Sequence, residues 1–303
     1  MLKETVEALI TDPGGIYLDG TVGSGGHSEG IGRRLSGSGR LICLDRDIDA
    51  VKLSGKRLKF LGDRVTVINT NFSDIGRVLQ RLNMSKVKGV LLDLGLSSYQ
   101  LERSGRGFSF NRDEPLDMRM DQRYSITAEK LINELSKKEI EKILRIYGEE
   151  RQARLISNII DRERRKKVIN SSLQLANLIR SALPSPRRPG TIDSATKTFQ
   201  AFRIEVNREL EHLERFLDII PPFIEKGGRL VFLSYHSLED RLVKQAIIKW
   251  EKACICPPDF PECMCGKEPI FKRIFKRGVK PGKTEKSDNP RSRSATLRVA
   301  ERI

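Results

Sequence analysis

The chain has 303 residues, of which 38% are hydrophobic and 32% charged, which suits one large or two modest domains. It has no apolar run near the length of about 18 residues that spans a bilayer, and no signal-peptide pattern at its start, so we expect a cytoplasmic protein without a membrane anchor. The net charge of +16 predicts a polyanionic partner, because Lys and Arg neutralise phosphates. A lysine-rich composition unrelated to binding is the alternative.

Residues 16–27 read as a short apolar strand followed by a glycine-rich turn. The spacing of Asp19, Thr21, Gly23 and Gly25 is typical of S-adenosylmethionine sites, whose ligand carries an ammonium and a sulfonium but no phosphate. The dinucleotide fingerprint is absent, because its third glycine falls on Ser28, and no phosphate-binding Gly-Lys-Ser/Thr follows. An ordinary turn at the end of a strand is the alternative reading.

Strand and helix patterns then alternate up to about residue 100. Apolar runs at 15–19, 40–45, 65–69 and 88–94 predict buried parallel strands, and amphipathic runs at 48–60 and 75–82 predict helices between them. Repeated β-α-β crossovers build a doubly wound sheet that binds ligands at the carboxyl ends of its strands. Polar residues occupy those ends, namely Asp19, Asp45, Asn69 and Asp93.

Three of the side chains near these strand ends have specific predicted roles. Asp45 follows Gly25 by 20 residues, the spacing at which an acid reaches the ribose hydroxyls of an adenosine ligand. Phe72 could pack on adenine, or equally belong to the core. Asp93 is the best candidate for a catalytic residue, although it could instead hold the methionine ammonium or cap a turn.

The pattern changes at about Glu102. An irregular loop over 104–120 precedes helical periodicity at 127–135, 137–147, 149–168 and 171–183, which predicts a helical insertion. One long helix is expected over 194–220. The alternating pattern then resumes with a strand at 229–234 and a helix up to Trp250, and strands at 270–275 and 295–300 could pair as an antiparallel hairpin.

Four of the five cysteines form two Cys-x-Cys pairs, Cys254 with Cys256 and Cys263 with Cys265. Disulfides are disfavoured in the cytoplasm, so reduced thiols are the expectation. Zinc binding and a redox role are the alternatives, and the spacing is not the usual one for zinc. Cys43 lies in an apolar strand and is expected in the core.

The chain resembles the bacterial 16S ribosomal RNA cytidine-N4 methyltransferases, the methyltransferase H family. The matching segments cover essentially the whole chain and are residues 19–28, 44–47, 91–101, 106–110, 115–121, 147–151, 198–204, 234–241 and 289–294. The resemblance implies a Rossmann-like class I methyltransferase with a seven-stranded mixed sheet, interrupted by an all-helical substrate-recognition insertion. On this basis residues 1–101 and 196–303 form the core, and residues 102–195 form the insertion.

The resemblance also implies a cofactor, a substrate and a set of contact residues. The implied S-adenosylmethionine contacts are Gly25, Gly26, His27, Asp45, Phe72, Asp93 and Gln100. The implied substrate is a cytidine in the decoding region of 16S ribosomal RNA in the small subunit, methylated on N4. The Asp/Asn-Pro-Pro-aromatic motif of many amine methyltransferases is absent after Asp93, so the amine target rests on the resemblance alone.

From charge and position we further predict RNA contacts at Arg291, Arg293 and His236. Two other functions remain open at this point. An NAD-dependent oxidoreductase is disfavoured by the missing third glycine and by the acid at Asp19. A ribosome-assembly factor without catalytic activity is disfavoured by the intact glycine turn and the acids at the strand ends.

Overall fold

The computed structural model describes residues 1–183, 193–254, 256 and 265–303. The chain forms two compact units, of which the first joins Met1–Gly95 to Leu210–Ile303 and the second consists of Leu96–Glu209. In the part of the chain that is described, no helix has the length and apolar character needed to cross a membrane. The assignment of substrate recognition to residues 102–195 stays a prediction.

The first unit is built on a seven-stranded sheet with the strand order β3-β2-β1-β4-β5-β7-β6. Its strands are β1 (Ile16–Asp19), β2 (Arg40–Asp45), β3 (Val65–Asn69), β4 (Val87–Asp93), β5 (Ile224–Ser234), β6 (Phe271–Arg273) and β7 (Thr296–Arg302). The strands β1 to β5 pair in parallel, whereas β7 pairs antiparallel with both β5 and β6. The predicted mixed sheet is confirmed, including the antiparallel pairing of the last two strands.

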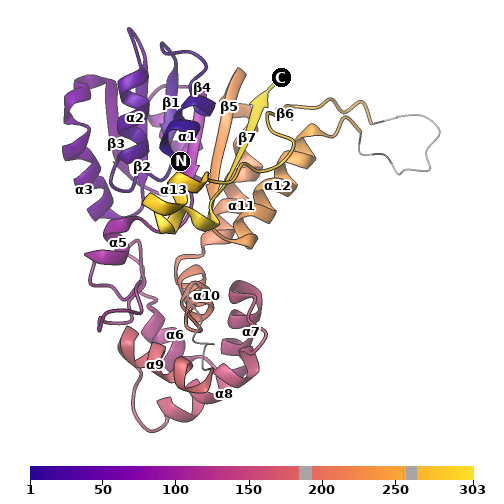
Figure 1. Cartoon of the computed structure of the whole chain (residues 1–303). Coiled ribbons are helices and arrows are strands. Elements are labelled where there is room, and N and C mark those ends of the chain that lie inside the picture. The colour runs from indigo at the N-terminus through magenta and orange to yellow at the C-terminus, as the bar shows by residue number, and fades with distance from the viewer. Residues whose placement is uncertain (184–192, 255, 257–264) are drawn as a thin grey trace. The chain divides into compact units, whose positions relative to one another are not determined.

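Helices cover both faces of this sheet (Figure 1). They are α1 (Leu2–Leu9), α2 (Gly26–Arg34), α3 (Ile48–Arg57), α4 (Ile75–Arg81), α11 (Glu209–Ile219) and α12 (Ser237–Glu251). The short helix α13 (Lys283–Asp288) also belongs to this unit but has no buried residue. Successive strand residues point to opposite faces, so Leu18 and Ile42 pack with α4, α11 and α12, whereas Tyr17 and Leu41 pack with α1 and α2. Strands buried on both faces need nearly continuous apolar sequences, which is why they were visible in the sequence.

The second unit is helical, and its described residues contain no strand. Its helices are α5 (Ser98–Glu102), α6 (Ala128–Glu134), α7 (Lys137–Gly148), α8 (Ala153–Arg164), α9 (Ser172–Ala182) and α10 (Thr196–Asn207). Side chains from these helices share a separate core that includes Ile132, Ile143 and Phe202. Local signals define the helix starts: Ser136 and Glu139 form a capping box at the beginning of α7.

The prediction of one long helix over 194–220 is wrong. The helix ends at Asn207, and α11 begins at Glu209. Arg208 between them has φ +47°, a left-handed conformation that cannot continue an α-helix. The side chain of Asn207 is 2% exposed and donates both to the Met118 carbonyl at 2.7 Å and to the Arg203 carbonyl of its own helix at 2.9 Å.

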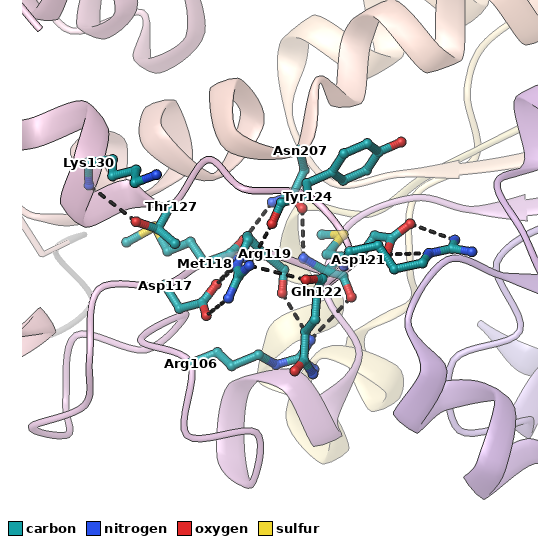
Figure 2. A network of polar contacts seen from close by, with 12 residues as sticks. Arg106, Asp117, Met118, Arg119, Asp121, Gln122, Tyr124, Thr127, Lys130 and Asn207 are labelled. Carbon is teal, nitrogen blue, oxygen red and sulfur yellow. Dashed lines mark hydrogen bonds and ion pairs between the residues drawn. The ribbon is translucent and has the colours of Figure 1, made fainter. Parts of the chain in front are cut away.

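Figure 2 shows the polar network that fixes the irregular loop before α6. Asn207 accepts a hydrogen bond from the Met120 N–H at 2.7 Å, and the Arg106 guanidinium donates to the carbonyls of Arg119 and Met120. Arg119 also forms a two-pronged ion pair with Asp117, at 2.7 Å for both bonds. The loop is therefore ordered by side-chain to backbone bonds in place of regular secondary structure.

Candidate cofactor site at the carboxyl ends of the strands

The glycine turn between β1 and α2 connects the ends of three strands. The Gly20 N–H donates to the Leu91 carbonyl of β4 at 2.9 Å, and the Val22 N–H donates to the Leu44 carbonyl of β2 at 2.9 Å. A Cβ on Gly20 would clash with the Leu92 side chain, so the turn can approach β4 this closely only with glycine. The turn thus occupies the edge where a doubly wound sheet binds its ligand.

Gly25 forms the N-cap of α2 with φ +84°, a conformation that favours glycine. The cap makes no side-chain hydrogen bond to the helix. The first N–H groups of a helix have no partner within the helix, and they carry the positive end of its dipole. Gly26 and His27 begin α2, so their end of the helix suits an anionic group such as the methionine carboxylate of the predicted cofactor.

Asp45 is held at the end of β2 by backbone donors. The Gly23 N–H donates to its Oδ2 and the Asp47 N–H to its Oδ1, both at 2.9 Å. Burial raises the pKa of Asp45 to about 6, although these two hydrogen bonds favour its charged form. Each carboxylate oxygen can accept a further bond, so the fixed side chain can receive two ribose hydroxyls.

His27, Asp93 and Tyr235 form a connected polar group at the ends of β4 and β5. His27 Nδ1 lies 3.1 Å from Asp93 Oδ2, and the Tyr235 hydroxyl donates to Asp93 Oδ1 at 2.8 Å. Burial disfavours the charged imidazole, but the hydrogen bond and charge of Asp93 outweigh it and raise the pKa of His27 above its ordinary value. Burial, together with Asp93, raises the pKa of Tyr235, so this hydroxyl stays protonated.

One nitrogen of this group is left for a ligand. His27 Nε2 is buried and has no hydrogen-bond partner among the described residues. A buried polar atom is costly unless something pairs with it. Together with the carboxylates of Asp45 and Asp93, which suit hydroxyl and cationic groups, this atom gives the site a set of hydrogen-bonding and charged groups that fits S-adenosylmethionine.

Asp19 is a buried carboxylate that stabilises the glycine turn of the site. Its side chain is 1% exposed and accepts hydrogen bonds from the Ser28 hydroxyl at 2.6 Å and the Thr21 N–H at 3.1 Å. Burial raises the pKa of Asp19 to about 6, although these two hydrogen bonds act in the opposite direction. Because Thr21 in turn accepts from the Asp93 N–H at 2.6 Å, Asp19 fixes the turn against β4.

The remaining predicted cofactor residues have structural partners of their own. Phe72 is 8% exposed, and its ring packs edge-on against Phe216 at 5.6 Å, so it belongs to the core of the first unit. Gln100 lies in the second unit, where its side chain completes the capping box of α5 with Ser97. Cofactor contacts at these two residues stay predictions.

The predicted RNA contacts lie on structured backbone. Arg291 and Arg293 are exposed on the turn η4 (Pro290–Ser294), and the buried Ser292 between them donates to the Asn289 carbonyl at 2.7 Å. His236 is the N-cap of α12 and lies 3.0 Å from a Glu239 oxygen, a local role that leaves its RNA contact a prediction.

Three of the clustered cysteines lie together: the sulfur atoms of Cys254, Cys256 and Cys265 are within 4.8 Å of one another. Cys263 lies outside the described residues. Cys43 is a buried free thiol on β2, as its apolar strand predicts.

Sequence reasoning missed Tyr235 as a member of the site and gave Thr21 no role of its own. Thr21 stood within the glycine pattern, but its hydroxyl contact with β4 depends on the pairing of β1 with β4. Tyr235 directly follows β5, which pairs with β4. Its position after a strand was the available signal, and only the strand order turns that signal into a contact with Asp93.

Comparison with known proteins assigns the chain to a family. The model of the MraW methylase family matches residues 1–303. The ribosomal RNA small subunit methyltransferase H of Symbiobacterium thermophilum is 47% identical over 303 residues, covering 100% of this chain and 95% of that protein. The protein of the same name from Lachnospira eligens is 45% identical, covering 100% and 96%.

The solved structures that match this chain are only distantly similar to it. An rRNA methylase from Streptococcus thermophilus aligns with a TM-score of 0.41 and 12% identity, covering 100% of this chain and 93% of that one. The assignment rests on the full-length matches in sequence. The chain belongs to the MraW methylase family.

Proposed function

We propose that this protein transfers a methyl group from S-adenosylmethionine to the exocyclic N4 of a cytidine in the decoding region of 16S ribosomal RNA. The observation that carries the proposal is the family match over residues 1–303, which includes both the unit with the glycine turn and the helical unit. Full-length relatives named ribosomal RNA small subunit methyltransferase H support small-subunit ribosomal RNA as the substrate. The protein then acts in the cytoplasm, on the small ribosomal subunit or its RNA.

The reaction is a direct displacement. Bound S-adenosylmethionine would supply an electrophilic methyl group: the N4 lone pair would bond to the methyl carbon as the carbon–sulfur bond breaks, and the electron pair of that bond would stay on the sulfur and neutralise it. N4 would then lose one proton to solvent water. Such a reaction depends mainly on the alignment of nucleophile, methyl and sulfur, which a site fixed by strand ends and a glycine turn can supply.

The residues of the site have distinct proposed roles. Asp45 accepts hydrogen bonds from the ribose hydroxyls, and the start of α2 at Gly26 and His27 receives the methionine carboxylate. Asp93 is the proposed residue beside the reacting amine, where its negative charge stabilises the positive charge that develops on N4. Tyr235 positions Asp93 through its hydroxyl, which lies 2.8 Å from Asp93 Oδ1.

Mass spectrometry of 16S ribosomal RNA tests the proposal directly. RNA from cells that lack the protein should lose one methyl group on a cytidine, and re-expression of the wild-type chain should restore it. Re-expression of Asp93→Ala should restore less of the modification. An unchanged set of modified nucleotides in cells without the protein would contradict the proposed substrate.

The cofactor is tested separately with purified protein. S-adenosylhomocysteine should raise the melting temperature, because a ligand that binds only the folded state stabilises it. NADH at the same concentration serves as the comparison. Stabilisation by NADH alone would instead support the oxidoreductase alternative.

A further inference from the structure

The thiols of the connection between α12 and β6 form a compact group. The sulfur atoms of Cys254, Cys256 and Cys265 lie within 4.8 Å of one another. The Cys256 N–H also donates to Cys254 Sγ at 3.3 Å. This bond orients the Cys254 sulfur relative to the backbone of Cys256.

The spacing of the sulfur atoms fits a zinc ion. At a Zn–S distance of about 2.3 Å and tetrahedral angles, two bound sulfurs lie about 3.8 Å apart. The sulfurs of Cys254 and Cys265 are 3.8 Å apart. A disulfide would bring them to about 2.05 Å. The observed distance is therefore the one expected for two sulfurs that bind the same zinc ion, not for a disulfide.

Apolar packing does not account for this grouping. Buried cysteines behave as small hydrophobic residues, and Cys43 in β2 is of that kind, with 0% exposure. By contrast, Cys254 is exposed and Cys256 and Cys265 are only half-buried. Burial therefore does not explain why these three thiols converge.

The ends of the connection are fixed by the sheet and by α12. The Ile270 N–H donates to the Trp250 carbonyl at 2.9 Å, and the Arg273 guanidinium pairs with Glu251 at 2.6 Å. The described residues between Glu251 and Phe271 contain no helix or strand. The three thiols lie among these described residues, near the two ends of the connection.

We propose that Cys254, Cys256 and Cys265 bind a zinc ion that fixes the connection between α12 and β6. The three thiolates fill three of the four positions of a tetrahedral ion. Binding releases the thiol protons, and because the site forms only in the folded chain, the ion also stabilises the fold. This metal site is independent of the proposed methyl transfer.

Metal analysis of the full-length protein tests this site. The wild-type chain, expressed with zinc in the medium and purified under reducing conditions without chelator, should contain about one zinc ion per chain. The double variant Cys254→Ser/Cys265→Ser should lose that zinc to background. Cys43→Ala is the matched control, because it removes a thiol outside the cluster and should leave the zinc content unchanged.

A second measurement covers the case in which the double variant fails to fold. Cobalt added to metal-free wild-type protein should give the absorption bands of thiolate-bound tetrahedral cobalt, and zinc should displace them. The zinc form should also resist alkylation at the three cysteines, and a chelator should abolish that protection. Zinc content equal in the wild type and the folded double variant, or absence of the cobalt bands, would overturn the proposal.

Discussion

Asp45 is a carboxylate that the backbone holds in place before any ligand binds, through the N–H groups of Gly23 and Asp47. We therefore predict that Asp45→Ala weakens the binding of S-adenosylhomocysteine by about 10- to 100-fold, the effect of removing a hydrogen bond to a charged group. The unliganded variant should still fold, with a melting temperature lowered by a few degrees, because the N–H groups of Gly23 and Asp47 lose their acceptor. Isothermal titration calorimetry measures the affinity.

The matched control for this variant is Asp63→Ala. Asp63 is an exposed carboxylate between β2 and β3, so its removal changes the net charge equally and should leave the affinity intact. Equal affinity in Asp45→Ala and the wild type would remove Asp45 from the site.

The raised pKa of Asp45 also predicts a pH dependence of binding. Burial raises this pKa from its ordinary value to about 6, so the free protein binds a proton at this carboxyl below pH 6. Ribose hydroxyls donate to the charged form, and binding must then release that proton. The dissociation constant should rise about tenfold for each pH unit below 6 and stay flat above it. In Asp45→Ala this dependence should be much weaker; an equally steep rise would assign it to another group.

For single residues, the sequence predicts which side chains lie at the strand ends better than it predicts which side chains they bond to. The acids at the ends of β1, β2 and β4 could be placed because parallel strands bring their carboxyl ends to one edge. The bond between Tyr235 and Asp93 could not, because it joins residues 142 positions apart in the chain through the pairing of β5 with β4. The metal-like grouping of three cysteines likewise depends on how the chain returns from α12 to β6.

At the level of elements, Asn207 connects the end of α10 to the loop before α6. Its side chain accepts from the Met120 N–H and donates to the carbonyls of Met118 and Arg203, with distances of 2.7 to 2.9 Å. We predict that Asn207→Ala lowers the free energy of unfolding by about 2–3 kcal/mol, because buried backbone groups lose their partners. Urea denaturation followed by circular dichroism measures the change.

Gln122→Ala provides the comparison for Asn207→Ala. Gln122 is exposed in the same loop and takes part in the network through its backbone carbonyl, which accepts from Arg119. This variant should stay within about 0.5 kcal/mol of the wild type. If Asn207→Ala were equally mild, the network would not be what orders the loop.

The break between α10 and α11 shows why sequence periodicity overestimates helix length. Apolar residues such as Phe202, Val206 and Leu213 continue at helical spacing through the break, and no glycine or proline interrupts them. The left-handed conformation falls on Arg208, a residue type that gives no such signal. The buried bonds of Asn207 to a distant loop end the helix, and those bonds become visible only in the folded chain.

At the scale of the whole molecule, some of the basic side chains are paired with acids and therefore attract phosphate less than others. The basic run in and after α8 lies beside acids that neutralise it: Arg164 and Arg165 pair with Asp161, whereas Arg162 and Lys166 pair with Glu163. A sequence count includes these side chains in the net charge of +16, but paired charges attract phosphate less. The count therefore predicts a polyanionic partner without indicating which surface binds it.

Arg291 and Arg293 provide a test of that surface. Both are exposed on a turn that Ser292 fixes through its bonds to the carbonyls of Asn289 and Glu285. We predict that Arg291→Glu/Arg293→Glu weakens binding to ribosomal RNA and lowers the slope of log affinity against log salt by about 1 for each phosphate that the variant no longer neutralises. Affinity for S-adenosylhomocysteine should stay unchanged, because neither residue lies at the glycine turn.

The control is Lys52→Glu/Lys56→Glu, which reverses two exposed charges on α3 and changes the net charge by the same amount. If RNA binding depends on specific phosphate contacts at the η4 turn, only the arginine variant loses affinity and salt dependence in filter-binding or anisotropy titrations. If it depends on overall charge alone, both variants weaken equally, because long-range attraction is set by the summed charge. Equal weakening would therefore refute the assignment of Arg291 and Arg293, while leaving the cofactor site and the family of the protein untouched.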